Sequence, residues 1–259
     1  MMLLPPDLVP TVNSEVRKVS TLRRNWLLAA GLPAVALVAA TTTALTAGPT
    51  DPEANPATGA ATIGLYLALL ATILTAAAVG AAGAGGEFRY RSMPLTALFT
   101  PDRDRIAAAK ALVTGAGALA VALIVEIVVL VCLFAFGRGK IAFGGQLFAV
   151  CGIGLLAVVC WALIGTAAGL LLRQSTGAVA LILGWLLFAE PLIWVIADAM
   201  GLGGLVTLLP GSATVGAVAV GSFPDSDILA PTPAAFVVLL LWTVALSAAA
   251  WWHLRTRAV

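Results

Sequence analysis

Charged side chains of this sequence gather in one short segment, Gly86 to Lys110, which reads GEFRYRSMPLTALFTPDRDRIAAAK. Lys, Arg, Asp and Glu make up only 10% of the 259 residues, and strongly apolar runs flank this segment on both sides. Clustered charge between apolar runs suits two tasks, which are binding a soluble partner and orienting the chain in a membrane. The charged residues are Glu87, Arg89, Arg91, Asp102, Arg103, Asp104, Arg105 and Lys110.

Catalytic and ATP-binding chemistry finds no support in the sequence. A single His and three Cys within apolar runs predict no metal site, no disulfide framework and no nucleophile with its base. A Walker A motif needs a Lys followed by Ser or Thr, whereas Lys18, Lys110 and Lys140 precede Val, Ala and Ile. We therefore expect no catalytic residue, no bound metal and no enzymatic activity from this chain by itself. The cysteines are Cys132, Cys151 and Cys160.

The composition indicates an integral membrane protein. The hydrophobic fraction of 61% and the mean hydropathy of +1.06 exceed what soluble domains show, since these are roughly 45 to 50% apolar. A formal net charge of +2 is too small to suggest a nucleic-acid partner. The predicted fold class is an all-α membrane protein with one transmembrane domain, 1–259.

Six windows are long and apolar enough to cross a bilayer, because a membrane helix needs about 20 residues. Stretches of small residues inside them, such as GAAGAGG from Gly80 to Gly86, predict helices that pack closely in a bundle. The windows are Trp26–Ala47, Ala60–Ala84, Ala111–Phe136, Leu147–Leu172, Ala178–Ala199 and Ala234–Trp252.

The positions of Lys and Arg predict that both termini are cytoplasmic. With this orientation 12 of the 14 basic residues lie inside, and only Arg138 and Lys140 lie outside. The segment 86–110 then lies in the cytoplasm between spans two and three.

Two further segments are predicted not to cross the membrane. Apolar residues recur at helical spacing in and just after segment 1–25, which predicts an amphipathic helix along the inner membrane surface; an ordinary juxtamembrane helix fits equally well. The segment 200–233 is external and apolar but is broken by Gly and Pro, so short re-entrant or interfacial helices are expected there. The recurring residues of the first segment are Val12, Val16, Val19, Leu22 and Trp26.

These features resemble the type 2 permeases of ABC transporters, which are membrane subunits of bacterial exporters. The resemblance covers nearly the whole chain, including its six predicted spans. Ser92 departs from the family, which often has threonine there. The motifs are GEFRYRS from Gly86 to Ser92, the pattern P.R.R....K from Pro101 to Lys110, SEVRKVSTLRRNW from Ser14 to Trp26, and LPGSATVGAV from Leu209 to Val218.

The resemblance implies that segment 86–110 forms a coupling helix that docks into a separate nucleotide-binding subunit. Glu87 and Arg89 would reach side chains of that partner, while Leu95, Leu98 and Phe99 would supply an apolar patch. Two ATPase copies that bind ATP and Mg, and a second permease as homodimer or heterodimer, would complete the transporter in the bacterial plasma membrane. The expected coupling residues are Glu87, Phe88, Arg89, Arg91, Leu95, Leu98, Phe99, Arg103 and Arg105.

The function implied by the resemblance is ATP-driven export, by alternating access, of a lipophilic compound, with cationic drugs and antibiotics among the candidates. Export of a lipid or a glycan is an alternative within the class. A membrane assembly or signalling protein that transports nothing is an alternative outside it. A secondary transporter fits less well, because the sequence has neither an internal repeat nor paired broken helices.

Two acids lie inside predicted spans, Glu126 in span three and Glu190 in span five, at similar depth and without Lys or Arg at that depth. A charged group there costs about 2.5 to 3.5 kcal/mol on insertion scales, so neither should face lipid. Either one or both acids line the translocation path and meet cationic or hydroxylated groups of a substrate, or each is a neutral acid that hydrogen-bonds a backbone carbonyl, Thr or Ser of a neighbouring helix.

Overall fold

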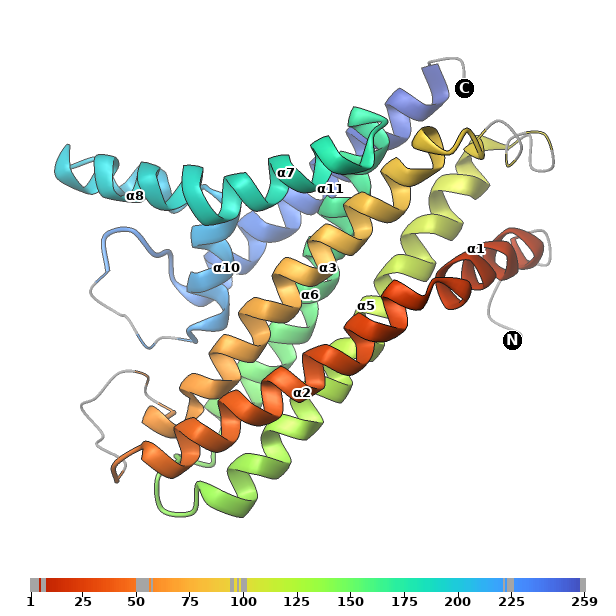
Figure 1. The fold of residues 1–259 in the computed structure, drawn as a ribbon. Helices are drawn as coiled ribbons and strands as arrows, with labels where there is room; N and C mark the ends of the chain where they lie inside the picture. The colour runs from red at the N-terminus through yellow and green to blue at the C-terminus, as the bar shows by residue number, and fades with distance from the viewer. Residues whose placement is uncertain are drawn as a thin grey trace.

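The computed structural model describes residues 5, 8–49, 56, 58–93, 96, 98, 102–220, 222 and 226–256. Within these ranges the regular elements are all helices, as predicted. Six of the helical segments are long and apolar enough to cross a membrane, which confirms the predicted number of spans. Figure 1 shows long helices packed lengthwise, with shorter helices along one flank.

The helical segments are longer than the predicted apolar windows at several ends. The fifth span is continuous but contains a five-residue π-helix, η2, between α7 and α8. The bounds are α1 Val9–Thr21, α2 Arg23–Thr46, η1 Ala60–Thr62, α3 Ile63–Arg89, α5 Arg103–Phe136, α6 Gly145–Leu172, α7 Ser175–Gly184, η2 Trp185–Ala189, α8 Glu190–Ala199, α9 Gly203–Val206, α10 Pro210–Val218 and α11 Thr232–Thr256.

The charged segment 86–110 is not one separate element. Its beginning belongs to α3, which continues through Arg89, and its end belongs to α5. The second helix starts where it does because Asp102 caps it, with an extended backbone and a side-chain oxygen that accepts from the Asp104 amide at 3.0 Å. Leu95 and Phe99 lie outside the described residues.

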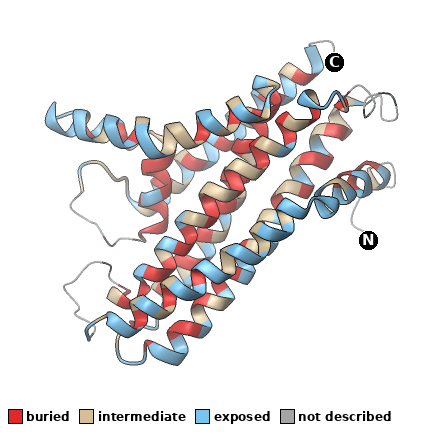
Figure 2. Ribbon diagram, viewed as in Figure 1, coloured by how far each residue is buried: buried red, intermediate tan, exposed pale blue. Residues whose placement is uncertain are grey.

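Helices α3 and α6 form the centre of the bundle, and Figure 2 shows that buried residues are concentrated on them. Small residues allow the close contact, because a Cβ atom added to Gly80 or Gly165 would collide with the backbone of the facing helix. Gly85 packs equally closely against the backbone of Gln174, whereas Gly83 faces open space. The predicted packing role of the GAAGAGG stretch is therefore confirmed for two of its glycines.

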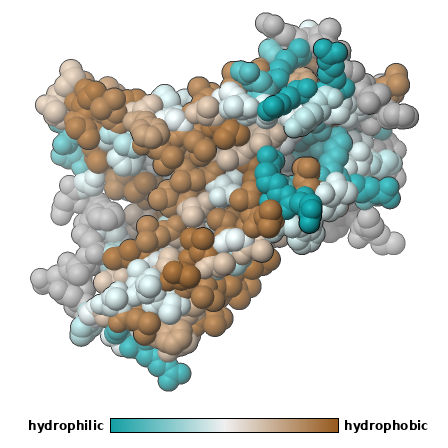
Figure 3. All heavy atoms as spheres, in the orientation of Figure 1, coloured by the Kyte–Doolittle hydropathy of each residue, from teal (hydrophilic) through white to brown (hydrophobic). Residues whose placement is uncertain are grey.

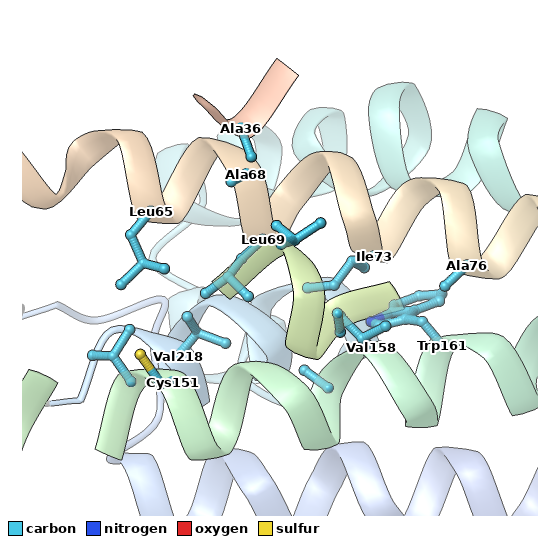
Figure 4. Close-up of a cluster of buried hydrophobic side chains, with 14 of the residues drawn as sticks. Ala36, Leu65, Ala68, Leu69, Ile73, Ala76, Cys151, Val158, Trp161 and Val218 are labelled. Atoms are coloured by element: carbon cyan, nitrogen blue, oxygen red, sulfur yellow. The ribbon is translucent and has the colours of Figure 1, made fainter. Parts of the chain in front are cut away.

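Larger apolar side chains fill the space between the central helices. Leu69 and Ile73 of α3 and Val158 and Trp161 of α6 belong to one buried cluster (Figure 4). The indole nitrogen of Trp161 donates to Thr214 Oγ1 of α10 at 2.8 Å, so the largest buried side chain keeps its polar atom bonded.

The two segments predicted not to span are helical but short. Helix α1 packs Val12 against Ala109 and Val113 of α5, while Val16 and Leu22 remain exposed. Helices α9 and α10 follow the fifth span, and nearly every residue of α10 is buried against the rest of the bundle. Contact of α1 with a membrane surface and re-entry of α9 and α10 from outside stay predictions.

Candidate functional site

Three helices meet in a cluster of four charged residues, which we call the ion cluster. Glu15 and Lys18 come from α1, Glu87 from the last turn of α3, and Lys110 from the first turns of α5. Helix α11 ends close by, because Arg103 donates to the Leu254 carbonyl at 2.7 Å. We call this end of the bundle the charged end.

Both lysines of the ion cluster bridge both glutamates. The Lys110 Nζ atom lies 2.9 Å from Glu15 Oε2 and 2.9 Å from Glu87 Oε1. The Lys18 Nζ atom lies 2.6 Å from Glu15 Oε1 and 2.8 Å from Glu87 Oε1. The two positive and two negative charges cancel, so the cluster joins three helices without net charge.

Three of the four members are withdrawn from solvent. Glu15, Glu87 and Lys110 are each less than a tenth exposed, and Lys18 is the member that reaches the surface. Burial raises the pKa of Glu15, but attraction and hydrogen bonds from Lys110 and Lys18 outweigh it and hold that pKa below its ordinary value. Burial lowers the pKa of Lys18, but its hydrogen bonds to Glu15 and Glu87 raise it overall.

The position of Glu87 corrects one expectation. We expected its carboxylate to reach side chains of a partner, but the carboxylate points into the ion cluster and is 7% exposed as a residue. The physical reason is that α3 continues past this residue, which turns the side chain toward α1 and α5. Its second oxygen, Oε2, is buried and accepts no hydrogen bond from the described part of the chain.

The residues just after the ion cluster are the ones that face outward. Arg89, Tyr90 and Arg91 are exposed, and Arg91, just after the end of α3, has a φ of 53°, a left-handed conformation uncommon outside glycine. We call these three residues the outward turn. Further along, Leu98 is 73% exposed, as an apolar contact patch would require.

Contacts with α7 and α6 hold the outward turn on the bundle. Arg89 Nη1 lies 3.3 Å from Thr176 Oγ1 at the start of α7. The Arg173 guanidinium lies over the Phe88 ring, with its central carbon 5.3 Å from the ring centroid. Phe88 is therefore an anchor to the α6 terminus.

The two remaining candidate coupling residues have partners within the chain. Arg103 bonds the Leu254 carbonyl of α11, and Arg105 pairs with Asp102 at 3.0 Å. Beneath them, Ile106 packs with Met93 and Leu254 in a small buried cluster. This arrangement secures the start of α5 to the end of α11.

Glu190 lies at a different place, at the junction of η2 and α8, and is 1% exposed. One carboxylate oxygen accepts from the Ser212 amide at 2.7 Å and the other from the Trp185 indole at 2.8 Å. Ser212 is in the first turn of α10, so the acid bonds the positive end of that helix. We expected a carbonyl or hydroxyl partner for a structural acid, and the structure supplies backbone and indole donors instead.

Gly211 makes this approach possible. A Cβ atom at that position would lie 2.7 Å from the Glu190 carboxyl atoms, which is closer than real Cβ contacts come. Glu190 therefore fixes the fold-back of α10 onto the fifth span.

Glu126 has a different environment from Glu190, although both are buried. Its Oε1 atom is without a hydrogen-bond partner among the described residues and faces Gly154 of α6, whose added Cβ would lie 3.2 Å away. Leu69 also packs against Gly154. Of the two membrane acids, Glu126 is thus the one with an unused acceptor.

Sequence reasoning missed the ion cluster, although a signal for it was present. Glu15 follows Val12 by three residues and precedes Val19 by four, so it lies on the apolar face of α1. An acid on the buried face of a helix needs a cation from a neighbouring element. Lys110, which interrupts the apolar run that follows Arg105 in α5, was the available candidate.

Comparison of the sequence with protein-family models and with curated proteins found no match.

Proposed function

We propose that this chain is the membrane subunit of an ABC exporter of type 2, driven by a separate ATPase. The observation that carries the proposal is the joining of the outward turn to three helices by the ion cluster. A segment that transmits the movement of a soluble partner needs an exposed contact surface and a stiff connection to the membrane helices. Arg89 and Arg91 offer the first, and the ion cluster offers the second.

The ion cluster supports transmission for a physical reason. Separating a buried pair exposes uncompensated charge in a medium of low dielectric, which costs several kcal/mol. A displacement of the end of α3 is therefore followed by α1 and α5, since breaking the contacts costs more than moving together. In this proposal Glu87 acts inside the permease, and the partner's contacts fall on the outward turn and Leu98.

The proposed cycle is alternating access by a pair of permeases and a pair of ATPase subunits. Closure of the ATPase subunits on ATP would displace both outward turns and rearrange a cavity between the permeases. The transported compound is lipophilic, because the surfaces available to line such a cavity are apolar. Glu126, with its unused oxygen, is the residue proposed to meet a cationic or hydroxylated substrate after rearrangement.

The decisive experiment reverses the charges of the outward turn. With the ATPase co-expressed, the Arg89→Glu and Arg91→Glu double variant should lose co-purification of the ATPase, or lose transport while ATP is still hydrolysed. Arg138→Glu is the matched control, because this exposed arginine follows the opposite end of α5. Full ATPase attachment together with full transport in the double variant would refute the proposal.

Two further measurements separate the alternatives. Purified by itself, the chain should not hydrolyse ATP, and turnover by the isolated chain would exclude a permease subunit. Glu126→Gln should change substrate-stimulated ATP hydrolysis without changing assembly if the residue meets substrate. ATP-dependent accumulation of a lipid or glycan, or an attached ATPase without any transport, would favour the lipid, glycan or signalling role.

A further inference from the structure

The junction of α1 and α2 is a fixed elbow. Helix α1 ends at Thr21, Leu22 is extended, and α2 begins at the next residue. Two side chains of α2 bond the last carbonyls of α1: Asn25 Nδ2 donates to the Val19 carbonyl at 3.0 Å, and Trp26 Nε1 donates to the Ser20 carbonyl at 2.7 Å. Because these bonds occupy carbonyls that a helix end leaves unsatisfied, the elbow keeps its shape.

The outward charge of this elbow is all positive. From residue 8 to residue 49 the sequence has one acid, Glu15, which is buried and bonded by Lys18 and Lys110. The other basic residues of the elbow are exposed, and no acid of that stretch is left to balance them. They are Arg17, Arg23 and Arg24.

A groove and an apolar surface accompany these cations. The groove has a volume of about 540 Å³, and its described lining includes Asn13, Ser14 and Arg17, whose side chains can donate hydrogen bonds. Beside the arginines of α2, Trp26 is 65% exposed and Leu27 is 73% exposed. Figure 3 shows polar side chains gathered near the charged end and apolar ones across the middle of this face.

We propose that the elbow binds the headgroup of an anionic phospholipid. Exposed arginines attract a phosphodiester, hydroxyl and amide donors in the groove complete its hydrogen bonds, and Trp26 and Leu27 contact the acyl chains. A tryptophan next to basic residues favours the boundary between the headgroups and the acyl chains of a bilayer. Trp26 and Leu27 lie at the start of a helix long and apolar enough to cross a membrane, so the exposed apolar residues adjoin the arginines where acyl chains would begin, which is why the lipid is the occupant argued for.

Binding of phosphatidylglycerol and phosphatidylcholine to the purified full-length chain tests the proposal, with native mass spectrometry as the readout. The wild-type chain should retain phosphatidylglycerol in preference. Arg17→Gln, Arg23→Gln and Arg24→Gln should each weaken that retention about fivefold, in line with the attraction of one basic residue to an anionic surface. Arg138→Gln, which removes an exposed arginine at the opposite end, should leave it unchanged.

Two outcomes would overturn the proposal. The first is equal retention of both lipids by the wild-type chain. The second is undiminished retention of phosphatidylglycerol by the triple variant, which combines Arg17→Gln, Arg23→Gln and Arg24→Gln. If the triple variant fails to assemble, the salt dependence of lipid binding by the wild-type chain tests the proposal instead. Raising ionic strength from about 0.05 M to about 0.5 M should weaken phosphatidylglycerol binding and spare phosphatidylcholine, and salt-independent binding would count against it. Glycerol phosphate in solution should not compete, because it lacks the acyl chains; effective competition would reveal a site for free phosphate esters and refute the lipid. None of these readouts needs an ATPase, so the result stands apart from the proposed transport function.

Discussion

Lys18 and Glu87 are 69 positions apart in the sequence, yet the Lys18 Nζ atom lies 2.8 Å from Glu87 Oε1. Lys18 also lies 3.4 Å from Thr96 Oγ1, so it touches both the end of α3 and the segment that follows the outward turn. The N-terminal helix is thereby joined to the part of the chain proposed to face an ATPase. A displacement of either the N-terminal helix or this part of the chain would therefore also displace the other.

Removing Lys110 should be the most damaging single change in the ion cluster. Lys110→Met leaves two glutamates facing each other with only the half-exposed Lys18 between them, and such losses cost about 3 to 5 kcal/mol. Thermal or denaturant unfolding in detergent would measure it. Arg105→Met is the matched control on the same helix, because its partner Asp102 is exposed and little should change. Equal stability of the two variants would mean that the ion cluster does not hold the helices together.

Acidification should release α1. The pKa of Glu15 is below its ordinary value of 4.5 in the folded chain, so its contribution to stability is complete above about pH 4.5 and is lost as pH falls through the lowered value. A thiol-reactive probe on Asn13→Cys would report the increased motion of α1, since the three native cysteines are buried. In Glu15→Gln the probe should already be mobile at neutral pH. A probe equally immobile at every pH would contradict the prediction.

The raised pKa of Lys18 predicts a second loss of stability, at high pH. Its contribution is complete below its ordinary value of 10.5 and is lost as pH rises through the higher folded value. Between these two pH ranges the contributions of Glu15 and Lys18 to the attachment of α1 should not change with pH. A change in probe mobility near pH 7 would therefore require a group other than Glu15 and Lys18.

Gly211→Ala should destabilise the fold-back of α10. The new methyl group would meet the Glu190 carboxylate at 2.7 Å, and the carboxylate can move aside only by giving up its bonds to Ser212 and Trp185, so we expect a cost of about 1 to 3 kcal/mol. Gly204→Ala, with open space around it, is the control and should be close to neutral. Adding Glu190→Ala to Gly211→Ala should cost less than the two single effects combined, because the clash is then gone. Additive losses in the unfolding measurements would show that the two residues do not interact.

Gly165→Ala tests the contact between the two central helices. Its Cβ would enter the backbone of Ala77, and backbone cannot move aside as a flexible side chain can. We expect poor assembly or a clear loss in unfolding temperature. Gly152→Ala is on the same helix and faces open space, so it should be tolerated or mildly stabilising. Comparable behaviour of the two variants would disprove the close packing.

The spans could be predicted from the sequence because their signal is local. The length and apolarity of each window specify a membrane helix without reference to any other part of the chain. The helix ends were less predictable. Charged residues such as Glu87 and Arg89 suggested the end of the span, but helix α3 continues through them because their side chains find partners on α1 and α7.

The ion cluster was missed because its bonds join residues as far as 95 positions apart, as Glu15 and Lys110 show, so the buried acid on α1 did not reveal which cation it meets. Lysines and arginines at a cytoplasmic boundary are also expected from orientation alone, which hides those that have a second role. Glu190 posed a similar problem. Its partner is a backbone amide of Ser212, and amide positions become known only when the path of α10 is known.

At Gly80 and Gly165 the backbones of α3 and α6 meet directly, with no side chain between them, which opposes sliding of the two helices past each other. In the proposed transporter the pair would move as one lever. Helix α3 has 27 residues, so this lever is about 40 Å long at 1.5 Å per residue. A push on the outward turn would emerge at its far end, where Gln146 of α6 donates to the Val220 carbonyl at 2.8 Å. The stroke of such a transporter would be delivered across the membrane by tilting, with the length of the helix setting its reach.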